Sequence, residues 1–135
     1  MTLYLLDTNA VADLMRDPSG PVAQRVALVG AGLVCTSIIV AAEIRFGAAK
    51  RASARLSQRV DQALGTIPVQ PFEPPVDRIY GDIRATLESL GTPIGDRDLL
   101  IAAHALALGC IVVTDNEDEF RRVPGLQVEN WLRSD

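Results

Sequence analysis

A chain of 135 residues with 48% apolar and 22% charged residues has the composition of a folded globular protein, which excludes a disordered chain. Its longest apolar runs, such as residues 38–42, are too short to span a bilayer, and Asp7 interrupts the N-terminus where a secretory signal would continue. We therefore expect a cytoplasmic protein without membrane contact. The formal net charge of −4 argues against a general nucleic-acid-coating protein but is compatible with a local basic patch.

Apolar segments that favour β-structure alternate with helical segments along the chain. Short strands are predicted at residues 2–6, 33–36, 66–72, 110–114 and 125–131. Helices are predicted from a cap at 7–9 to about residue 15, and at 21–30, 38–49, 52–64, 75–90 and 96–108. Pro68 and Pro71 confine the third strand to a sheet edge, because proline cannot donate to a central ladder.

The predicted strands are continuous apolar runs, which is typical of a parallel sheet covered on both faces. We therefore predict an α/β fold, a three-layer α/β/α sandwich with a central parallel sheet, built as a single domain over residues 1–135. Cys35 and Cys110 stand beside apolar residues in two of these strands. We interpret both as buried free thiols.

Polar side chains occur where the predicted strands end. Asp7 directly follows the first strand, and Asp115 and Asn116 follow the fourth. Asp98 lies in the first turn of the last long helix, where backbone N–H groups favour an anion. Ligands bind at the carboxyl ends of parallel strands, so these side chains are expected at one edge. The ordinary alternatives are a helix cap for Asp7 and a helix-dipole charge for Asp98.

Glu43 is a further acidic candidate. It stands among apolar neighbours on the helix at 38–49, which is expected to be mostly buried, and burying an isolated carboxylate is costly without a partner or a cation. The alternative is an ion pair with a buried arginine. Asp96 is interpreted as a cap or a solvated charge. Crowded carboxylates repel one another unless a cation lies among them, and oxygen ligands select Mg²⁺ or Mn²⁺. The sequence therefore predicts a metal site.

Two other features have both ordinary and functional interpretations. His104, the only histidine, lies on an apolar helix and is interpreted as a satisfied core or surface residue. A single histidine also excludes cleavage of RNA by a two-histidine acid–base pair. Five basic residues within fifteen positions have no acid among them: Arg45, Lys50, Arg51, Arg55 and Arg59. They form either a solvated helix face or a contact for backbone phosphates near the acidic site.

Four segments resemble, in order and spacing, the PIN-domain toxins of VapC type: "LLDTNAVADL", "VAAEIRFGA", "PIGDRDLLIAAHALALGCIVVTDNEDEF" and "VPGLQVENW". The resemblance covers residues 3–131. It implies that Asp7 and Asp98 hold Mg²⁺, which activates a water, and that Glu43 orients this water.

The sequence departs from the family pattern at one position. Many PIN domains have a fourth acid where Asn116 stands, two residues after Thr114. An amide there retains hydrogen bonding but removes a charge. Asn116 is therefore included in the predicted catalytic set, and Asp96 or Asp115 are candidates to compensate for the missing charge.

The resemblance also implies a biological role. It suggests a Mg²⁺-dependent endoribonuclease, the toxin half of a type II toxin–antitoxin pair, acting as a homodimer that a VapB-like antitoxin inhibits. RNA is the expected substrate, with a tRNA anticodon loop as one candidate, since some similar toxins cut there. DNA is expected to be contacted only through the antitoxin.

Three other functions are alternatives to this one. A catalytically silent PIN scaffold that binds RNA or a partner protein is favoured only by Asn116. A phosphoacceptor module needs a lysine after a late strand, but Lys50, the only lysine, lies on a helix in the other half of the chain. A phosphatase of the haloacid dehalogenase type needs an aspartate where Asn9 stands.

Overall fold

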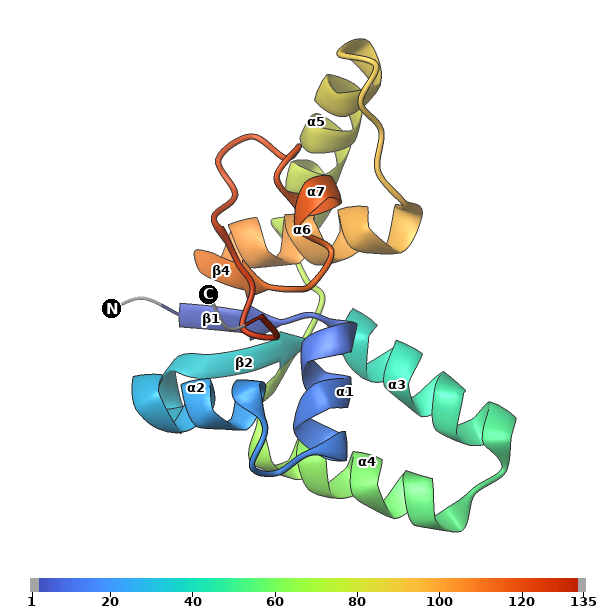
Figure 1. The fold of residues 1–135 in the computed structure, drawn as a ribbon. Helices are drawn as coiled ribbons and strands as arrows, with labels where there is room; N and C mark the ends of the chain where they lie inside the picture. The colour runs from blue at the N-terminus through green and yellow to red at the C-terminus, as the bar shows by residue number, and fades with distance from the viewer. Residues whose placement is uncertain (1–2, 134–135) are drawn as a thin grey trace.

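Five parallel strands form the central sheet of the computed structural model, which describes residues 3–133 (Figure 1). They are β1 (Leu3–Leu6), β2 (Val34–Ser37), β3 (Val69–Gln70), β4 (Cys110–Val113) and β5 (Val128–Glu129). β2 and β4 are buried along their whole length, and Cys35 and Cys110 within them are buried free thiols, as predicted. The predicted parallel sheet is thus confirmed. Thr2, where the first strand was predicted to begin, lies outside the described residues.

Seven α-helices occur in the described part of the chain. They are α1 (Thr8–Arg16), α2 (Pro21–Val29), α3 (Ile38–Arg51), α4 (Ala54–Thr66), α5 (Val76–Ser89), α6 (Asp96–Leu108) and α7 (Glu117–Phe120), with a short 3-10 helix at Ala31–Leu33. Figure 1 shows α1, α2 and α4 on one side of the sheet and α5, α6 and α7 on the other, which confirms the three-layer sandwich. Within residues 3–133, no helix has both the length and the apolar character needed to cross a membrane.

The strand order β3-β2-β1-β4-β5 contains one switch in direction. From β1 the chain adds β2 and β3 on one side, then returns to add β4 and β5 on the other. Right-handed crossovers therefore place the helices before and after β3 on opposite faces. The switch lies between β1 and β4, whose register pairs Leu6 with Val113. The next residues, Asp7 and Thr114, consequently leave the sheet side by side at its carboxyl edge.

The two edge strands and α7 differ from the sequence prediction. β3 and β5 have two residues each, whereas seven were predicted for each segment. Pro68 and Pro71 flank β3 and limit its ladder. The end of the last segment packs instead of pairing, because Trp131 is buried against Tyr4 with ring centroids 5.0 Å apart. Helix α7 has no predicted counterpart.

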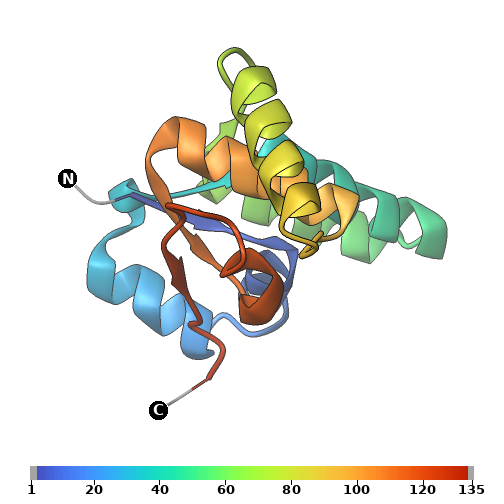
Figure 2. The same ribbon diagram turned by 90° about the horizontal axis from the view of Figure 1, so that it is seen from above.

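Helix α3 is less buried than the sequence predicted. Figures 1 and 2 show α3 and α4 as a pair that extends beyond the edge of the sheet. Phe46 is 62% exposed and Ile38 is 44% exposed, so the expectation of a mostly buried helix is wrong. Because the helix leans away from the sheet, only the side carrying Val40, Ala41 and Ala48 is buried.

His104 lies in the core, which confirms its predicted burial, but only one of its two ring nitrogens has a hydrogen-bond partner, since Nε2 has none among the described residues. Its side chain is fully buried on α6 and meets Phe72 edge-on, with ring centroids 5.4 Å apart. Ser37 Oγ lies 2.7 Å from Nδ1 of His104 and also accepts the Ile39 N–H, so its own proton is available to the imidazole. Burial lowers the pKa of His104 and favours the neutral ring. Ser37 therefore caps α3 and anchors α6 at once.

Ser37→Ala is expected to lower the free energy of unfolding by about 2–4 kcal/mol, because it removes a helix cap and leaves a buried imidazole nitrogen unpaired. Ser53→Ala is the matched control, since Ser53 caps α4 by accepting the Leu56 N–H and has no buried partner. It is expected to cost about 1 kcal/mol. Urea denaturation measures both variants, and equal losses would contradict a separate contribution from His104.

Candidate active site

Asp7 is more than a helix cap. It follows β1 directly, and its N–H donates to Val113 O over 2.9 Å, extending the β1–β4 pairing by one residue. Asp7 occupies the N-cap position of α1, but its side chain makes no capping hydrogen bond there. The carboxylate instead accepts the Thr114 hydroxyl over 2.7 Å. Burial raises the pKa of Asp7, and the bond from Thr114 opposes this shift.

Asn9 and Thr114 join the two loops that follow β1 and β4. The Asn9 amide donates to Asp7 and to Thr114, each over 3.4 Å, and its oxygen accepts the Asp115 N–H over 3.0 Å. Thr114 Oγ1 also accepts the Asn116 N–H over 2.9 Å. The sequence alone gave neither Asn9 nor Thr114 a role in the site. Both act as positioning residues, because they orient the carboxylate of Asp7 and the loop that carries Asn116.

Asn116 contacts two carboxylates. Its side-chain amide donates to Asp98 Oδ2 over 2.8 Å and to Glu119 Oε2 over 2.9 Å. Asp98 lies in the first turn of α6 and Glu119 on α7, so the amide joins two helices. Glu119 was missed by the sequence analysis. Its spacing of three residues from Asn116 is a helical spacing, but a four-residue helix gives too little periodicity to reveal it.

The carboxyl groups of Asp98 and Glu119 are neighbours, because both accept from the side-chain amide of Asn116. Burial, the hydrogen bond with Glu119 and the nearby charge of Asp7 together raise the pKa of Asp98 to about 7. Hydrogen bonds from Asp98 and Asn116 lower the pKa of Glu119. Near neutral pH Asp98 is therefore partly protonated, whereas Glu119 is ionised. Asp7 lies close enough for its charge to contribute to this shift.

Glu43 joins the site through Arg97. It forms an ion pair with Arg97, whose side chain is 51% exposed, while that of Glu43 is 34% exposed. The positive charge of Arg97 acts to lower the pKa of both Asp7 and Asp98, the smallest of the effects on each, so this guanidinium is near enough to influence both aspartates. The sequence offered an ion pair between Glu43 and a buried arginine as the alternative. Its partner is indeed an arginine, but Arg97 is exposed. Nothing in the sequence distinguished Arg97 from other surface arginines.

Asp96 and Asp115, the two candidates to replace the missing charge, point elsewhere. Asp96 is exposed and borders a small cavity of about 90 Å³ beside α5. The carboxylate of Asp115 accepts the Asn130 amide over 2.9 Å. Asn116 and Glu119 are therefore the residues that lie against Asp98. The catalytic roles of Asp7, Glu43, Asp98 and Asn116 remain predictions.

The donor chemistry of the site fits a hard cation such as Mg²⁺. Within residues 3–133, no three acidic, histidine or cysteine side chains are already gathered as a metal-binding group. The available donors are nevertheless all oxygens, which Mg²⁺ and Mn²⁺ prefer. Thr8 Oγ1, next to Asp7, is buried without a hydrogen-bond partner. Protonation of Asp98 reduces its repulsion with Asp7 and Glu119, and a bound cation would reduce that repulsion further. Because a carboxylate binds a metal in its deprotonated form, metal binding requires Asp98 to release this proton.

Asp98→Asn is expected to stabilise the protein at about pH 8 in the absence of divalent cations and to lose this advantage near pH 4. Folding raises the pKa of Asp98 from 3.8 to about 7, so this carboxyl makes the folded state less stable as the pH rises through that interval. The amide does not titrate, and it can still accept from Asn116 and donate to Glu119. Because Asp98 is only partly buried, we expect a gain of about 1–2 kcal/mol.

Urea denaturation across this pH range measures the effect, with Asp96→Asn as the control. Asp96 stands on the same helical turn but is exposed and does not contact Glu119. Its variant should follow the wild-type pH dependence. If Asp98→Asn also retained the wild-type pH dependence, the raised pKa of Asp98 would be refuted.

Comparison with known proteins gives one consistent result. The model of the PIN domain matches residues 4–126. Ribonuclease VapC2 of Rickettsia felis is 35% identical over 131 residues, which are 96% of this chain and 98% of that protein. The tRNA(fMet)-specific endonuclease VapC of Salmonella typhimurium is 33% identical over 132 residues, which are 97% of this chain and 99% of that protein.

Solved structures agree with the sequence relatives. VapBC2 from Rickettsia felis, bound to a DNA fragment from the promoter, has a chain that superimposes with a TM-score of 0.87 at 32% identity, covering 96% of this chain and 99% of that one. FitAcB from Neisseria gonorrhoeae gives a TM-score of 0.86 at 28% identity, covering 98% and 100%. The match therefore extends over nearly the whole chain in both comparisons.

Proposed function

Because this chain belongs to the PIN-domain family and is similar to VapC ribonucleases over nearly its full length, we propose that it is a Mg²⁺-dependent endoribonuclease and the toxin of a type II toxin–antitoxin pair. One observation carries the proposal. Asp7 accepts from Thr114 and Asp98 accepts from Asn116, so the loop after β4 holds both carboxylates at the carboxyl edge of the sheet, where ligands bind in this class of fold.

Asp7 and Asp98 are the residues proposed to hold the cation, Mg²⁺ or Mn²⁺. When bound, the cation supplies positive charge that lowers the pKa of water and offsets charge on the phosphate. Thr114 orients the carboxylate of Asp7, and Asn116 orients that of Asp98. These hydrogen bonds pre-organise both carboxylates, so little reorganisation is needed when substrate binds.

Glu43 is proposed to orient the attacking water, as the sequence predicts. Its ion pair with Arg97 keeps its carboxylate next to the residue that precedes Asp98. Arg97 provides a cation beside both aspartates, and its partial exposure leaves donors available to a phosphate oxygen. If a substrate phosphate replaced the Glu43 carboxylate as the partner of Arg97, that carboxylate would be free to accept a proton from water.

The partners follow from the relatives. The Rickettsia felis VapBC2 complex and its promoter DNA support a VapB-like antitoxin as partner, with DNA contacted only through the antitoxin. The named activity of the Salmonella typhimurium relative supports tRNA as substrate, and a tRNA anticodon loop remains the candidate cleavage site. We propose a homodimer that acts in the cytoplasm, where these RNA substrates are found.

A catalytically silent PIN scaffold that binds RNA or a partner is the second candidate. Asn116 supports it, because a neutral amide stands where many family members have an acid. The lack of a preassembled metal-binding group in residues 3–133 supports it as well. Cleavage assays separate the two, since a scaffold binds RNA without cutting it.

Asp7→Asn and Asp98→Asn are each expected to reduce RNA cleavage by about 100-fold or more, because each removes an anionic oxygen proposed to bind the cation. EDTA should abolish wild-type cleavage and Mg²⁺ should restore it. Single-turnover cleavage of unfractionated tRNA measures these effects. Asp115→Asn is the control, since the carboxylate of Asp115 contacts Asn130 instead, and should remain near wild type. Full wild-type activity in EDTA would exclude the metal mechanism.

Cleavage is expected to leave a 5′-phosphate and a 3′-hydroxyl. Attack by water does not involve the 2′-hydroxyl, whereas the cyclic-phosphate route needs an acid–base pair. The only histidine, His104, is fully buried and hydrogen-bonded to Ser37, so it is unable to serve such a route. End-labelling of the fragments decides between the two routes, and a 2′,3′-cyclic phosphate would rule out the proposed chemistry.

A further inference from the structure

A groove leads from the acidic site along the pair of helices α3 and α4. One cavity, of about 400 Å³, is bordered by Thr8 and Glu43 at the acidic site and by Arg51 and Arg59 further along. A second cavity, of about 310 Å³, shares these two arginines and adds Arg55. We call the two cavities together the arginine groove; the residues used to define it are Thr8, Arg16, Glu43, Arg51, Arg55 and Arg59.

Three of its four arginines have no ion-pair partner. Within the described part of the chain, Arg51, Arg55 and Arg59 are exposed and form no salt bridge. The neighbouring Arg45, outside the groove, pairs with Asp61 over 2.8 Å. Arg16 pairs with Asp13 over 3.4 Å. The groove therefore carries uncompensated positive charge in a protein whose formal net charge is −4.

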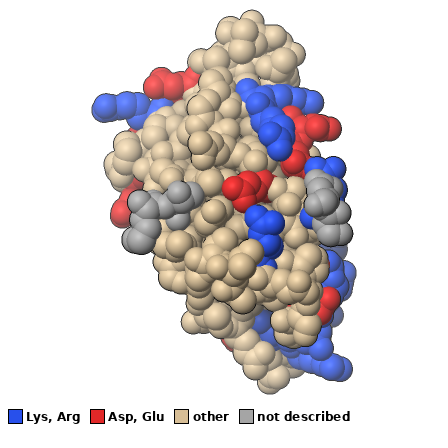
Figure 3. Space-filling model, turned by 60° about the vertical axis from the view of Figure 1, so that its left-hand side comes forward, with Lys and Arg blue, Asp and Glu red and all other residues tan. Residues whose placement is uncertain are grey.

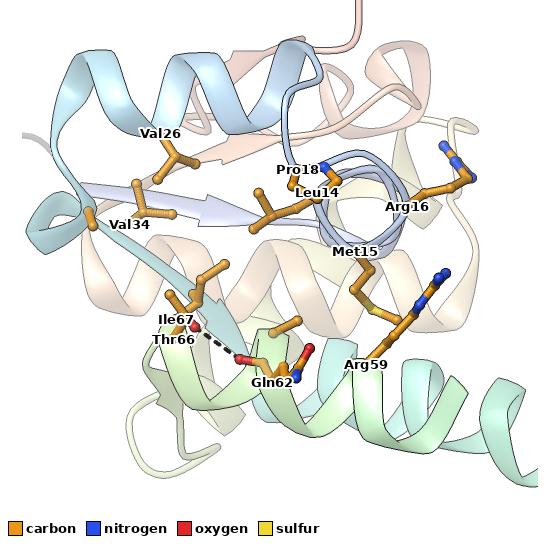
Figure 4. Close-up of a pocket in the computed structure, with 12 residues that line it drawn as sticks. Leu14, Met15, Arg16, Pro18, Val26, Val34, Arg59, Gln62, Thr66 and Ile67 are labelled. Carbon is orange, nitrogen blue, oxygen red and sulfur yellow. Dashed lines mark hydrogen bonds between the residues drawn. The ribbon is translucent and has the colours of Figure 1, made fainter. Parts of the chain in front are cut away.

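The positions of the arginines on α4 lower the stability of that helix. Arg55 and Arg59 stand four residues apart on one helix, and like charges at that spacing repel. Figure 3 shows Lys and Arg side chains gathered along the lower right margin of the molecule, at the height of α4 in Figure 1. Figure 4 shows Arg16 and Arg59 extending toward the same side from α1 and α4. Since the lining of the groove comes from α1, α3 and α4, its arginines do not form the face of a single helix.

We propose that the arginine groove binds the sugar–phosphate backbone of the RNA substrate and leads it to the acidic site. This inference rests on the proposed nuclease function. Glu43 and Arg51 are eight residues apart on α3, a rise of about 12 Å, so a strand that reaches from one to the other spans more than one phosphate. Phosphate contacts at this distance position a polymer without reading its sequence. An acidic segment of a partner protein is the competing occupant.

The test measures RNA binding in a background that does not cleave. Three proteins are compared, each carrying Asp7→Asn. One has the wild-type groove, one carries Arg59→Gln, and one carries both Arg55→Gln and Arg59→Gln. Fluorescence anisotropy gives the Kd for a single-stranded polyuridine oligonucleotide between about 50 and 200 mM KCl. Each lost arginine is expected to reduce the slope of log K against log salt by about 0.7. Arg78→Gln is the matched control, an exposed arginine on α5.

A variant that retains both charges tests whether a loss of RNA binding comes from a structural change in α4. Arg55→Lys/Arg59→Lys preserves both cations and should retain the wild-type salt slope, whereas a general disturbance of α4 would lower binding in both doubles. In the cleaving background, the Gln double variant should raise KM for a long RNA more than it lowers kcat, since the groove is proposed to bind the backbone and not the reacting phosphate.

Each other outcome overturns the proposal. If the Gln double variant changes the salt slope no more than Arg78→Gln while wild type binds and cleaves RNA, the groove does not bind the backbone and the nuclease function stands. If the same variant binds RNA normally but no longer binds a co-expressed antitoxin, the groove is a protein-docking surface. Failure of the wild type itself to bind or cleave RNA would instead refute the proposed function.

Discussion

A parallel pairing between β1 and β4 fixes the relative positions of the loops that carry most of the site. The hydrogen bond of 2.7 Å from Thr114 to Asp7 extends this pairing from the backbone into the side chains. Asn9 then binds the same two loops, and Asn116 carries the connection on to Asp98. A chain of hydrogen bonds therefore runs from the end of β1 to the start of α6. The carboxylates of Asp7 and Asp98 are thus oriented by the neutral donors Thr114 and Asn116 from the loop after β4, which is how a pre-organised site is built.

Concentrating carboxylates at one edge has an electrostatic cost, and the protein offsets it in three ways. Arg97 supplies a positive charge that acts on Asp7 and Asp98, Asn116 donates to two carboxylates at once, and the raised pKa of Asp98 leaves it partly protonated near neutral pH. The folded state is thus compatible with these acids at neutral pH. The same three devices are weak compared with a divalent cation, which supplies more charge at shorter distance.

The central sheet was predictable, because buried parallel strands occur as continuous apolar runs in the sequence. The positions of Asp7 and Asn116 at its edge were predictable as well, because they follow two of these runs. Asp98 was predictable from its place at a helix start. Glu119 and Arg97 were not, since their roles depend on how α7 and α6 pack rather than on local pattern. The exposure of α3 was also misjudged, because an apolar composition does not tell whether a helix packs on the sheet or leans beyond its edge.

The buried hydrogen bond between Ser37 and His104 also connects two helices of the candidate site. Ser37, the N-cap of α3, precedes Glu43 by six residues, and His104 follows Asp98 by six residues on α6. Six residues of helix rise about 9 Å. The hydrogen bond between Ser37 and His104 therefore joins the start of α3 to the middle of α6, the two helices that carry Glu43 and Asp98. The helices that hold two of the predicted catalytic acids are thus connected inside the core, away from the acids themselves.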